Sequence, residues 1–308
     1  MKVEQLCNCF EERLRYLLNE FDNIMIALSA GAESSILLDL FYKVWKEEFK
    51  NRNVCVFNVD TEIAHSYSVL HIMERFEQIK NDMDAYWIML PTKIKHSLFG
   101  KEEQLLAWDS SLEKCLRPCP KLPYVVNLDN NPITSYRYGM PARMLASAFL
   151  KWYKHESGGG RTVCINGARA AEPHNRNMLL GSQKHYRQND WISMSTPEIW
   201  HASPLHDWSI TDVWVTISEL KVKYNQIYDL LYMRGDSLDG FRITPPLEIN
   251  SYKEIRRFAE LDGIIWDDLT RRIKGIELYS TYSDPRPLFD HIKEKPHRKE
   301  KQLEKSNL

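Results

Sequence analysis

The 308-residue sequence lacks an excess of either charge, because 41 Lys and Arg stand against 42 Asp and Glu, for a formal net charge of −1. A chain with this balance has no overall basic field that would draw it to nucleic acid. No apolar run approaches the roughly 20 residues that span a bilayer, and the first ten residues lack the apolar core of a signal peptide. We therefore expect a cytoplasmic protein with no membrane partner.

Cysteine is scarce, with six scattered residues in the chain, which does not suggest a disulfide framework. Cys115 and Cys119 are spaced like half of a metal site, but no second close pair of Cys or His lies beside them. A tetrahedral site needs four ligands, so we interpret both as plain thiols. Cys55 and Cys164 lie in apolar, strand-like runs and are predicted to belong to the core.

What the sequence does contain is ordinary globular composition, with 43% hydrophobic and 27% charged residues, which excludes wholesale disorder. Short continuous apolar runs, typical of strands buried on both faces, alternate with stretches of helical spacing. This alternation predicts right-handed βαβ units and a parallel sheet. The predicted strands are residues 23–28, 54–59, 86–90, 162–166 and 199–202. One helix, residues 3–21, is predicted before the first strand. The helices predicted between the strands are one that follows residue 35, residues 66–83 and residues 141–154. Residues 91–138 are predicted to form an irregular insertion beside the sheet.

From residue 209 onward only helices are predicted. Ser209 and Asp212 have the spacing of a capping box, which marks a helix start. The predicted helices are residues 209–221, 226–234, 252–261 and 266–279. Residues 293–305 carry six Lys or Arg against three Glu without apolar periodicity. They are interpreted as a solvated tail, with a nucleic-acid contact as the alternative.

The first candidate functional segment lies between a predicted strand and a predicted helix, where backbone N–H groups and the helix dipole converge on an anion. Its small residues would let the backbone approach a phosphate, and its hydroxyls would add donors. Glu33 would repel a phosphate unless Mg²⁺ lay between them. An ordinary strand–helix turn with a serine cap is the alternative. The small residues are Ala30, Gly31 and Ala32, and the hydroxyl residues are Ser29, Ser34 and Ser35.

Two further segments follow predicted strands. Asp60 and Glu62 end the second strand and are candidates to bind a metal or a ribose, with a helix N-terminal acid as the alternative. Gly167 ends a later strand, and Arg169 and Arg176 follow it. Arginine forks suit the oxygens of phosphate or sulfate. Because ligands of open α/β sheets bind at the carboxyl ends of the strands, we expect these segments to share one edge.

Together these segments resemble the PP-loop ATP pyrophosphatases, also called adenine nucleotide alpha-hydrolases, and among them the phosphoadenylyl-sulfate (PAPS) reductases. The first segment is similar to their Ser-Gly-Gly-x-Asp-Ser loop, with Ala30 in place of Gly and Glu33 in place of Asp. The third is similar to Gly-x-Arg-x-x-Glu-Ser-x-x-Arg, with Pro173 in place of Ser. The matching residues are Ser29, Gly31, Ser34, Gly167, Arg169, Glu172 and Arg176.

A fourth segment extends the resemblance, which covers roughly residues 20–245. Residues 204–214 are similar to the family's Pro-Leu-x-Asp-Trp-x-x-x-Asp-Val-Trp pattern, and the Tyr224-Asn225 pair is where the family has Tyr-Asn. Trp208 and Trp214 are interpreted as core or wall. Further matches resemble the subgroup typified by immunoglobulin-binding-regulator A proteins; they are Tyr232, Gly235, Ser237 and Arg242.

The resemblance implies a Rossmann-like, HUP-type α/β fold, a parallel sheet flanked by helices, with a helical C-terminal appendage. The expected organisation is an N-terminal helix (1–20), a PP-loop nucleotide-binding domain (21–208), a helical region (209–290) and a charged tail (291–308). The implied ligand is ATP or a related adenine nucleotide such as PAPS or 3′-phosphoadenosine 5′-phosphate.

Two chemistries remain open. In the first, ATP is cleaved between its α and β phosphates and a substrate is adenylylated. The phosphates would then be bound by residues 29–32, 34 and 35 with Gly167, and Glu33 and Asp60 would hold Mg²⁺. Arg169 and Arg176 would stabilise developing charge. In the second, the chain is a nucleotide-binding regulatory subunit that acts with a DNA-binding partner. The oligomeric state stays open, with a homo-oligomer among the alternatives.

PAPS reduction itself is disfavoured. Reductases of this family use a cysteine near the C-terminus as the nucleophile on sulfur, and no cysteine follows Cys164 in this sequence. The cysteine pairs that ligate an iron–sulfur cluster in related proteins are also missing, so no such cluster is expected.

Overall fold

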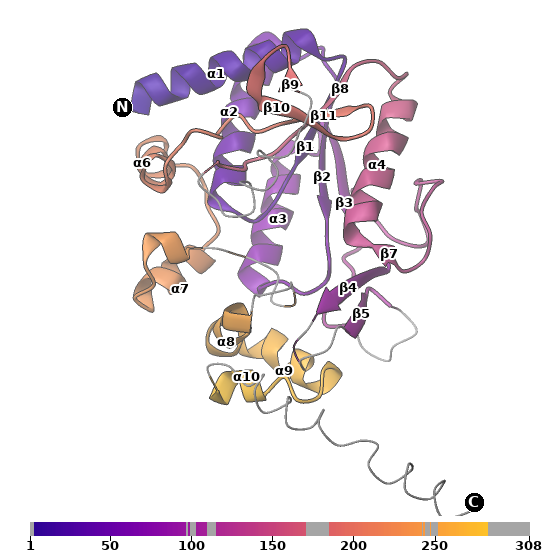
Figure 1. Ribbon diagram of the computed structural model, residues 1–308, viewed down its shortest axis with the longest axis vertical. Coiled ribbons are helices and arrows are strands. Elements are labelled where there is room, and N and C mark those ends of the chain that lie inside the picture. Colours follow the sequence, from indigo (N-terminus) through magenta and orange to yellow (C-terminus); the bar gives the residue numbers. More distant parts are fainter. Residues whose placement is uncertain are drawn as a thin grey trace, which may run out of the picture.

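The computed structural model describes residues 3–96, 98, 103–109, 115–170, 185–241, 243, 247 and 252–282, apart from the side chains of 195, 239 and 252–254. An eight-stranded sheet forms its centre (Figure 1). Its strands lie in the order β6 (Val125–Val126), β3 (Asp84–Ile88), β2 (Val54–Val59), β1 (Asn23–Ala27), β8 (Thr162–Ile165), β11 (Ile199–Ala202), β10 (Asn189–Thr196) and β9 (His185–Tyr186). The first six pair in parallel, and β10 and β9 add two antiparallel pairings at one edge. The predicted α/β class with a parallel-dominated sheet is confirmed.

Helices cover both faces of the sheet because successive side chains of a strand point to opposite sides. On β1, Ile24 and Ile26 pack into the core beneath one helical layer, whereas Met25 packs into the core on the other face. The larger layer lies on the side where Figure 1 shows α2 and α3, and α4 covers the opposite face. The helices are α1 (Val3–Glu20), α2 (Ala32–Glu48), α3 (Ser66–Ile79) and α6 (Ile210–Leu220) in the larger layer, and α4 (Ala142–Glu156) on the other face.

A small second sheet and a group of short helices lie at the carboxyl end of the central strands. The second sheet has the order β5 (Glu103–Ala107), β4 (Thr92–His96), β7 (Met140–Pro141). Beyond it lie α8 (Tyr252–Leu261), α9 (Gly263–Arg272) and α10 (Leu278–Thr281), while α7 (Ile227–Met233) and a 3₁₀ turn (Leu238–Gly240) connect α6 to this group (Figure 1). The short helices share a core of their own that includes Ile63, Leu98 and Leu116.

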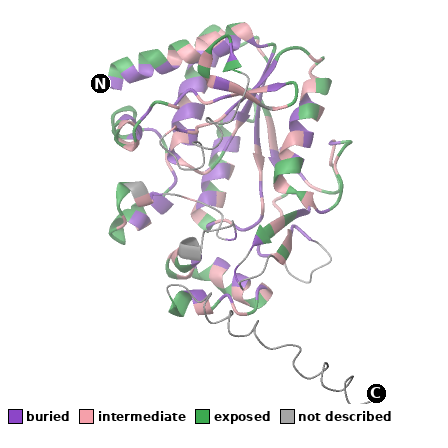
Figure 2. Ribbon diagram, viewed as in Figure 1, coloured by how far each residue is buried: buried purple, intermediate pink, exposed green. Residues whose placement is uncertain are grey.

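Figure 2 shows that the central strands are almost wholly buried and that the helices expose their outer faces. Among the described residues, the helices do not combine the length and the apolar character needed to cross a membrane. All six cysteines are described and are free thiols, and Cys55 and Cys164 lie in the core as predicted.

The element boundaries follow the sequence pattern closely in the parallel part of the sheet. The capping box at Ser209 is confirmed, since the Asp212 N–H donates to the Ser209 hydroxyl over 3.1 Å and the Ser209 N–H donates to the Asp212 carboxylate over 2.9 Å. The segment 91–138 is not irregular throughout, because it contributes β4, β5 and β6. Strands β9 and β10 were not predicted, and the predicted helix 266–279 is divided into α9 and α10.

Candidate functional site

Two loops meet where the adjacent parallel strands β1 and β8 end. Gly167, just after β8, lies so close to the start of α2 that a Cβ atom there would be 3.0 Å from the backbone C of Glu33 and 3.0 Å from the N of Ser34. Real Cβ contacts are longer, so only glycine allows this approach. The two predicted motifs are therefore in direct contact.

The loop after β1 is stabilised by its own serines. The Ser29 N–H donates to the Ser34 hydroxyl over 2.9 Å, and the Gly31 N–H donates to the Ser29 hydroxyl over 3.3 Å. The Ser35 hydroxyl donates to the Gly31 carbonyl over 3.1 Å. Gly31 is the N-cap of α2 and adopts extended backbone angles, so the first helical turn, whose N–H groups have no acceptor within the helix, begins at Ala32.

Residues from distant segments hold this loop from outside. The hydroxyl of Tyr228 accepts the Ala32 N–H over 3.0 Å, and the Asn225 side-chain amide donates to the Ala30 carbonyl over 3.3 Å. The Ser35 hydroxyl is 2.9 Å from Nε2 of His71 on α3. Burial and the nearby Arg75 lower the pKa of His71 to about 4, so its imidazole is neutral at physiological pH.

Arg169 and Glu33 form an ion pair across the two loops, with Arg169 Nε 2.8 Å from a carboxylate oxygen of Glu33. Only 10% of the arginine side chain and 18% of the glutamate side chain are exposed. A charge-assisted bond in so little solvent fixes the position of the guanidinium beside the loop. The same pair brings the carboxylate of Glu33 to the lining of the space beside the loop.

The carboxylate of Asp60 is enclosed by donors. The Glu62 N–H donates to one oxygen over 2.7 Å, Trp87 Nε1 donates to the other over 2.8 Å, and Arg117 bonds to that second oxygen as well. The guanidinium of Arg117 also lies over the ring of Trp108, 4.6 Å from its centroid. Asp60 therefore sits in a preformed network at the end of β2.

Glu62 is wholly buried and is the centre of a second set of contacts. Its carboxylate accepts the N–H groups of Trp108 over 2.7 Å and Leu116 over 2.6 Å, and it pairs with Arg272 of α9 over 2.8 Å. Its backbone has a φ of 70°, a left-handed conformation that is uncommon outside glycine. The sequence did not identify Arg117 or Arg272, because both lie far along the chain from the turn that they bind.

Two cavities lie over these loops. A cavity of about 420 Å³ is lined by the loop after β1 and the loop after β8, including Ser29, Glu33 and Arg169. A second cavity of about 240 Å³ lies over the end of β2 and is lined largely by apolar residues. Ser29 and Ile243 line both cavities, so the two meet over the first loop.

The structure brings together most of the predicted site residues. Glu33 and Asp60, the predicted pair of Mg²⁺ ligands, line different cavities. In the described ranges, no three His, Cys, Asp or Glu side chains are grouped in a way that could hold a metal ion. Arg176 and Glu172 lie outside the described residues. The residues that line one or both cavities are Ser29, Ala30, Gly31, Glu33, Ser34, Asp60, Gly167 and Arg169, whereas Ala32 and Ser35 lie just behind the loop.

The smaller cavity has a wall built from the C-terminal helices. The ring of His65 stacks on Phe258 of α8, with centroids 3.6 Å apart and planes at 19°. Burial lowers the pKa of His65 to about 4, although Asp262 opposes this shift. A largely apolar space with an aromatic wall suits a planar ring.

One curated protein is similar to the chain over most of its length. The sequence is 22% identical over 278 residues to a protein of Escherichia coli K12 described as "Uncharacterized protein YbdN", covering 88% of this chain and 66% of that protein. The chain thus spans about two thirds of the length of this curated relative.

Several solved structures also match. They include a PAPS reductase from Candida auris in a phosphate complex, at a TM-score of 0.39 and 16% identity, covering 74% of this chain and 90% of that one. An FMN adenylyltransferase from Candida glabrata in complex with ATP matches at a TM-score of 0.41 and 12% identity, covering 74% of this chain and 58% of that one. The sequence model of the phosphoadenosine phosphosulfate reductase domain matches residues 23–236, and the chain belongs to this family.

Proposed function

We propose that the chain binds an adenine nucleotide along the two cavities, with the phosphates in the larger one and the adenosine in the smaller one. The observation that carries the proposal is that the cavity containing Glu33 and Arg169 meets a more apolar cavity at Ser29, directly over the N-terminus of α2. Phosphates favour a helix N-terminus because its N–H groups and its dipole both attract anions. The apolar cavity beside His65 and Phe258 would take the base.

The phosphate contacts are assigned to the residues at the contact between the two loops. The hydroxyls of Ser29 and Ser34 accept N–H groups of the loop, which leaves their O–H groups to donate to a phosphate, and Gly167 lets the second loop come close enough to complete the cradle. Arg169 is fixed beside this space by Glu33. We assign to it, together with Arg176, the stabilisation of charge on the phosphates.

The reaction that we propose is cleavage of ATP between the α and β phosphates. An oxygen nucleophile of an acceptor attacks the α-phosphorus, the bond from that phosphorus to the bridging oxygen breaks, and pyrophosphate leaves with that oxygen. The acceptor is thereby adenylylated. Preorganised donors around the phosphates, rather than covalent chemistry by the protein, would lower the barrier.

PAPS reduction by a thiol of this chain is disfavoured by the cavities themselves. None of the six cysteines, all of which are described, lines either cavity. Burial also raises the pKa of the thiols of Cys7, Cys55, Cys115, Cys119 and Cys164, which keeps them protonated and weakly nucleophilic.

Mg²⁺ is assigned a limited role. The described residues do not form a cage for it, because the Asp60 carboxylate is enclosed by donors and Glu33 pairs with Arg169. Mg²⁺ in nucleotide sites is held mainly by phosphates and water with one or two carboxylates. Glu33 lines the phosphate cavity and is the residue that we propose to complete such a set. No step of the reaction is assigned to the ion.

The second candidate function is nucleotide binding without turnover, in a regulatory subunit that acts with a DNA-binding partner. The Glu33–Arg169 pair favours it, because a guanidinium already held by a carboxylate is less available to a phosphate. Membership of the subgroup typified by immunoglobulin-binding-regulator A proteins and the nucleic-acid contact of the tail stay predictions. Residues 293–305 lie outside the described ranges.

Arg169→Ala and Ser29→Ala test the site assignment by calorimetric titration with ATP. Each variant removes a donor from the phosphate cavity and should reduce ATP affinity by about tenfold or more, since a charge-assisted or well-placed hydrogen bond contributes about 1–3 kcal/mol. Arg187→Ala is the matched control, because Arg187 is exposed and pairs with Glu20 away from the cavities. If both site variants bind ATP as the unmodified chain does, the assignment is wrong.

A further inference from the structure

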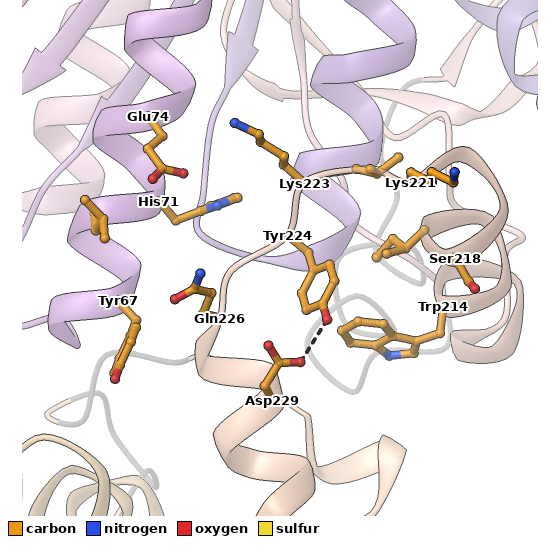
Figure 3. A pocket seen from close by; sticks show the side chains of 13 residues that line it. Tyr67, His71, Glu74, Trp214, Ser218, Lys221, Lys223, Tyr224, Gln226 and Asp229 are labelled. Atoms are coloured by element: carbon orange, nitrogen blue, oxygen red, sulfur yellow. Dashed lines mark hydrogen bonds between the residues drawn. The ribbon is translucent and has the colours of Figure 1, made fainter.

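A third cavity, of about 670 Å³, lies outside the proposed nucleotide site. It is formed between α3 on one side and the end of α6 and the start of α7 on the other (Figure 3). Its size is in the range of small-molecule sites. We call it the α3–α6 cavity; its lining residues are Tyr67, Leu70, His71, Glu74, Trp214, Ile217, Ser218, Lys221, Val222, Lys223, Tyr224, Gln226 and Asp229.

The inner part of the α3–α6 cavity is aromatic and apolar. Trp214 and Tyr224 meet edge to face with centroids 5.6 Å apart, and the neutral imidazole of His71 points toward the same space (Figure 3). The indole N–H of Trp214 is buried and has no hydrogen-bond acceptor. The aromatic lining of this cavity favours a ligand with a ring, which can pack on these side chains.

The rim of the α3–α6 cavity carries charges of both signs. Lys221, Lys223, Glu74 and Asp229 are exposed residues of the lining, and the described contacts include no ion pair for any of them. Asp229 accepts a hydrogen bond from the Tyr224 hydroxyl over 2.8 Å. A ligand with a single charge would be attracted to some of these side chains and repelled by others. A ligand that carries one positive and one negative charge can pair each of them with an opposite charge on the rim.

The α3–α6 cavity shares a wall with the phosphate cavity. Trp214 packs edge to face on Tyr228 at 4.9 Å and on Phe241 at 5.8 Å. Tyr228 and Phe241 both line the phosphate cavity on their other side. A ligand ring that packs on Trp214 therefore restricts a side chain that contacts Tyr228 and Phe241, and both of these line the phosphate cavity.

One chain segment also serves both sites. Tyr224, Gln226 and Asp229 line the α3–α6 cavity, whereas Asn225 and Tyr228, between them in sequence, hold the loop after β1 through Ala30 and Ala32. Across the cavity, His71 contacts Ser35 of that same loop and helix start. The cavity thus touches the supports of the phosphate loop on two sides.

We propose that the α3–α6 cavity is an effector site for an aromatic zwitterion of the amino-acid class, and that its occupation tightens nucleotide binding. The ring lies against Trp214 and Tyr224, and the carboxylate and the ammonium group of the ligand face the charged rim, where Lys223 and Glu74 point toward the same side of the cavity (Figure 3). A ligand in the cavity adds contacts to residues 222–229, and this segment contains Asn225 and Tyr228, which hold the phosphate loop. Less conformational entropy is then lost when the nucleotide binds, so the two ligands bind cooperatively.

Binding is tested first without nucleotide, so that its outcome is independent of the proposed function. The full chain is titrated calorimetrically with L-tryptophan, L-tyrosine and L-phenylalanine. At least one should bind, whereas glycine, which has no ring, should not. Tryptamine and N-acetyl-L-tryptophan each lack one of the two charges and should bind several-fold more weakly than L-tryptophan. If none of the three amino acids binds, or if the single-charge analogues bind equally well, the ligand class is wrong.

Variants then locate the site. Lys221→Gln/Lys223→Gln should weaken binding several-fold, and Trp214→Leu should do the same, because it removes the ring on which the ligand packs. Lys151→Gln, an exposed lysine on α4 across the sheet, is the control and should leave binding unchanged. Unfolding midpoints confirm that each variant is folded. Binding that survives both substitutions would place the ligand elsewhere and overturn the proposal.

The coupling is measured last. The Kd for ATP should fall by about fivefold or more when the bound amino acid is saturating, and the amino-acid Kd should fall by the same factor in saturating ATP. Lys221→Gln/Lys223→Gln should lose this effect while its ATP affinity alone stays unchanged. Amino-acid binding with an unchanged ATP Kd would contradict the coupling. Absence of ATP binding under all conditions would instead contradict the nucleotide-site proposal.

Discussion

At the scale of single residues, Gly167 defines the candidate site more sharply than any charged side chain. Its Cα lies against the backbone of Glu33 and Ser34, and this approach holds the two loops in one cradle. A sequence pattern can mark such a glycine, since it follows a buried strand and precedes two arginines. The pattern cannot show which backbone it touches, because that depends on the pairing of β1 with β8.

Gly167→Ala tests this contact. The new Cβ would lie about 3.0 Å from the backbone of Glu33 and Ser34, so the loops must separate. We expect a loss of about 1–3 kcal/mol in the free energy of unfolding, as for overpacking in general, and a drop in ATP affinity. Urea denaturation and calorimetry measure the two effects.

The control for this prediction is Gly263→Ala, at the start of α9, where nothing lies within 4 Å of an added Cβ. Alanine there should be neutral or slightly stabilising, because it is the better helix former. An unchanged stability in Gly167→Ala would mean that the loops yield freely and that the close approach is not required.

The acidic residues of the site illustrate the limit of residue patterns. Glu33 and Asp60 were assigned together as Mg²⁺ ligands because both follow strands that end at the same edge. In the structure each carboxylate has its own partners. Glu33 pairs with Arg169, and Asp60 accepts hydrogen bonds from Trp87 and Arg117. Partners that are 27 or more positions away, such as Trp87 and Arg117 for Asp60, leave no local signal in the sequence.

At the scale of elements, the C-terminal helices are fastened to the site by the turn that ends β2. Arg272 of α9 pairs with the buried carboxylate of Glu62 and also donates to the Leu106 carbonyl of β5. Phe258 of α8 covers His65 at the edge of the smaller cavity. These helices therefore form part of the proposed adenosine wall rather than a separate appendage.

Arg272→Met tests this attachment. It leaves the wholly buried Glu62 carboxylate with two backbone N–H donors but without its cation, and removal of one partner of a buried pair costs about 3–5 kcal/mol. We expect a loss near the lower end of that range, measured by urea denaturation. The neighbouring Arg271→Met is a close control, because Arg271 is largely exposed and its polar contacts among the described residues are with Asp268 and with the Asp267 carbonyl on its own helix. Its cost should stay below about 1 kcal/mol. Equal effects of the two substitutions would contradict the account.

The elements that the sequence predicted well are the buried parallel strands, because each has a continuous apolar run and a following helix with clear spacing. Strands β9 and β10 were not predicted, because their residues are mostly polar and partly exposed at the edge of the sheet and so give no continuous apolar run. The β4–β5 hairpin was also missed. Its alternating Thr92-Lys-Ile-Lys-His96 carries only one aliphatic residue, and its pairing with β5 decides its conformation.

At the scale of the whole molecule, two buried histidines make stability depend on pH. Burial is the main cause that lowers the pKa of both His65 and His71 to about 4, against about 6.5 in the unfolded chain. Between these values the unfolded state binds protons that the folded state does not, so the free energy of unfolding falls as pH decreases from about 6.5 to about 4. Each histidine contributes a slope of up to about 1.4 kcal/mol per pH unit in this window.

His71→Gln isolates one of these contributions. Glutamine can still hydrogen-bond to the Ser35 hydroxyl through its side-chain amide but does not titrate. The slope of unfolding free energy against pH should become shallower by about 1.4 kcal/mol per pH unit between pH 6 and 4.5, as measured by urea denaturation at a series of pH values. His155→Gln, in which an exposed histidine is replaced, should leave the slope unchanged. A slope in His71→Gln equal to that of the unmodified chain would show that His71 titrates normally.

The whole architecture points to one central claim, that the cleft over the N-terminus of α2 holds an adenine nucleotide. The most direct measurement is a calorimetric titration of the full chain with ATP and with 3′-phosphoadenosine 5′-phosphate, each with and without Mg²⁺, followed by an assay of the ATP samples for pyrophosphate. The account predicts saturable, one-to-one binding of ATP and release of pyrophosphate when Mg²⁺ is present. Binding without pyrophosphate would retain the site and favour the regulatory alternative, whereas no binding of either nucleotide would contradict the central claim.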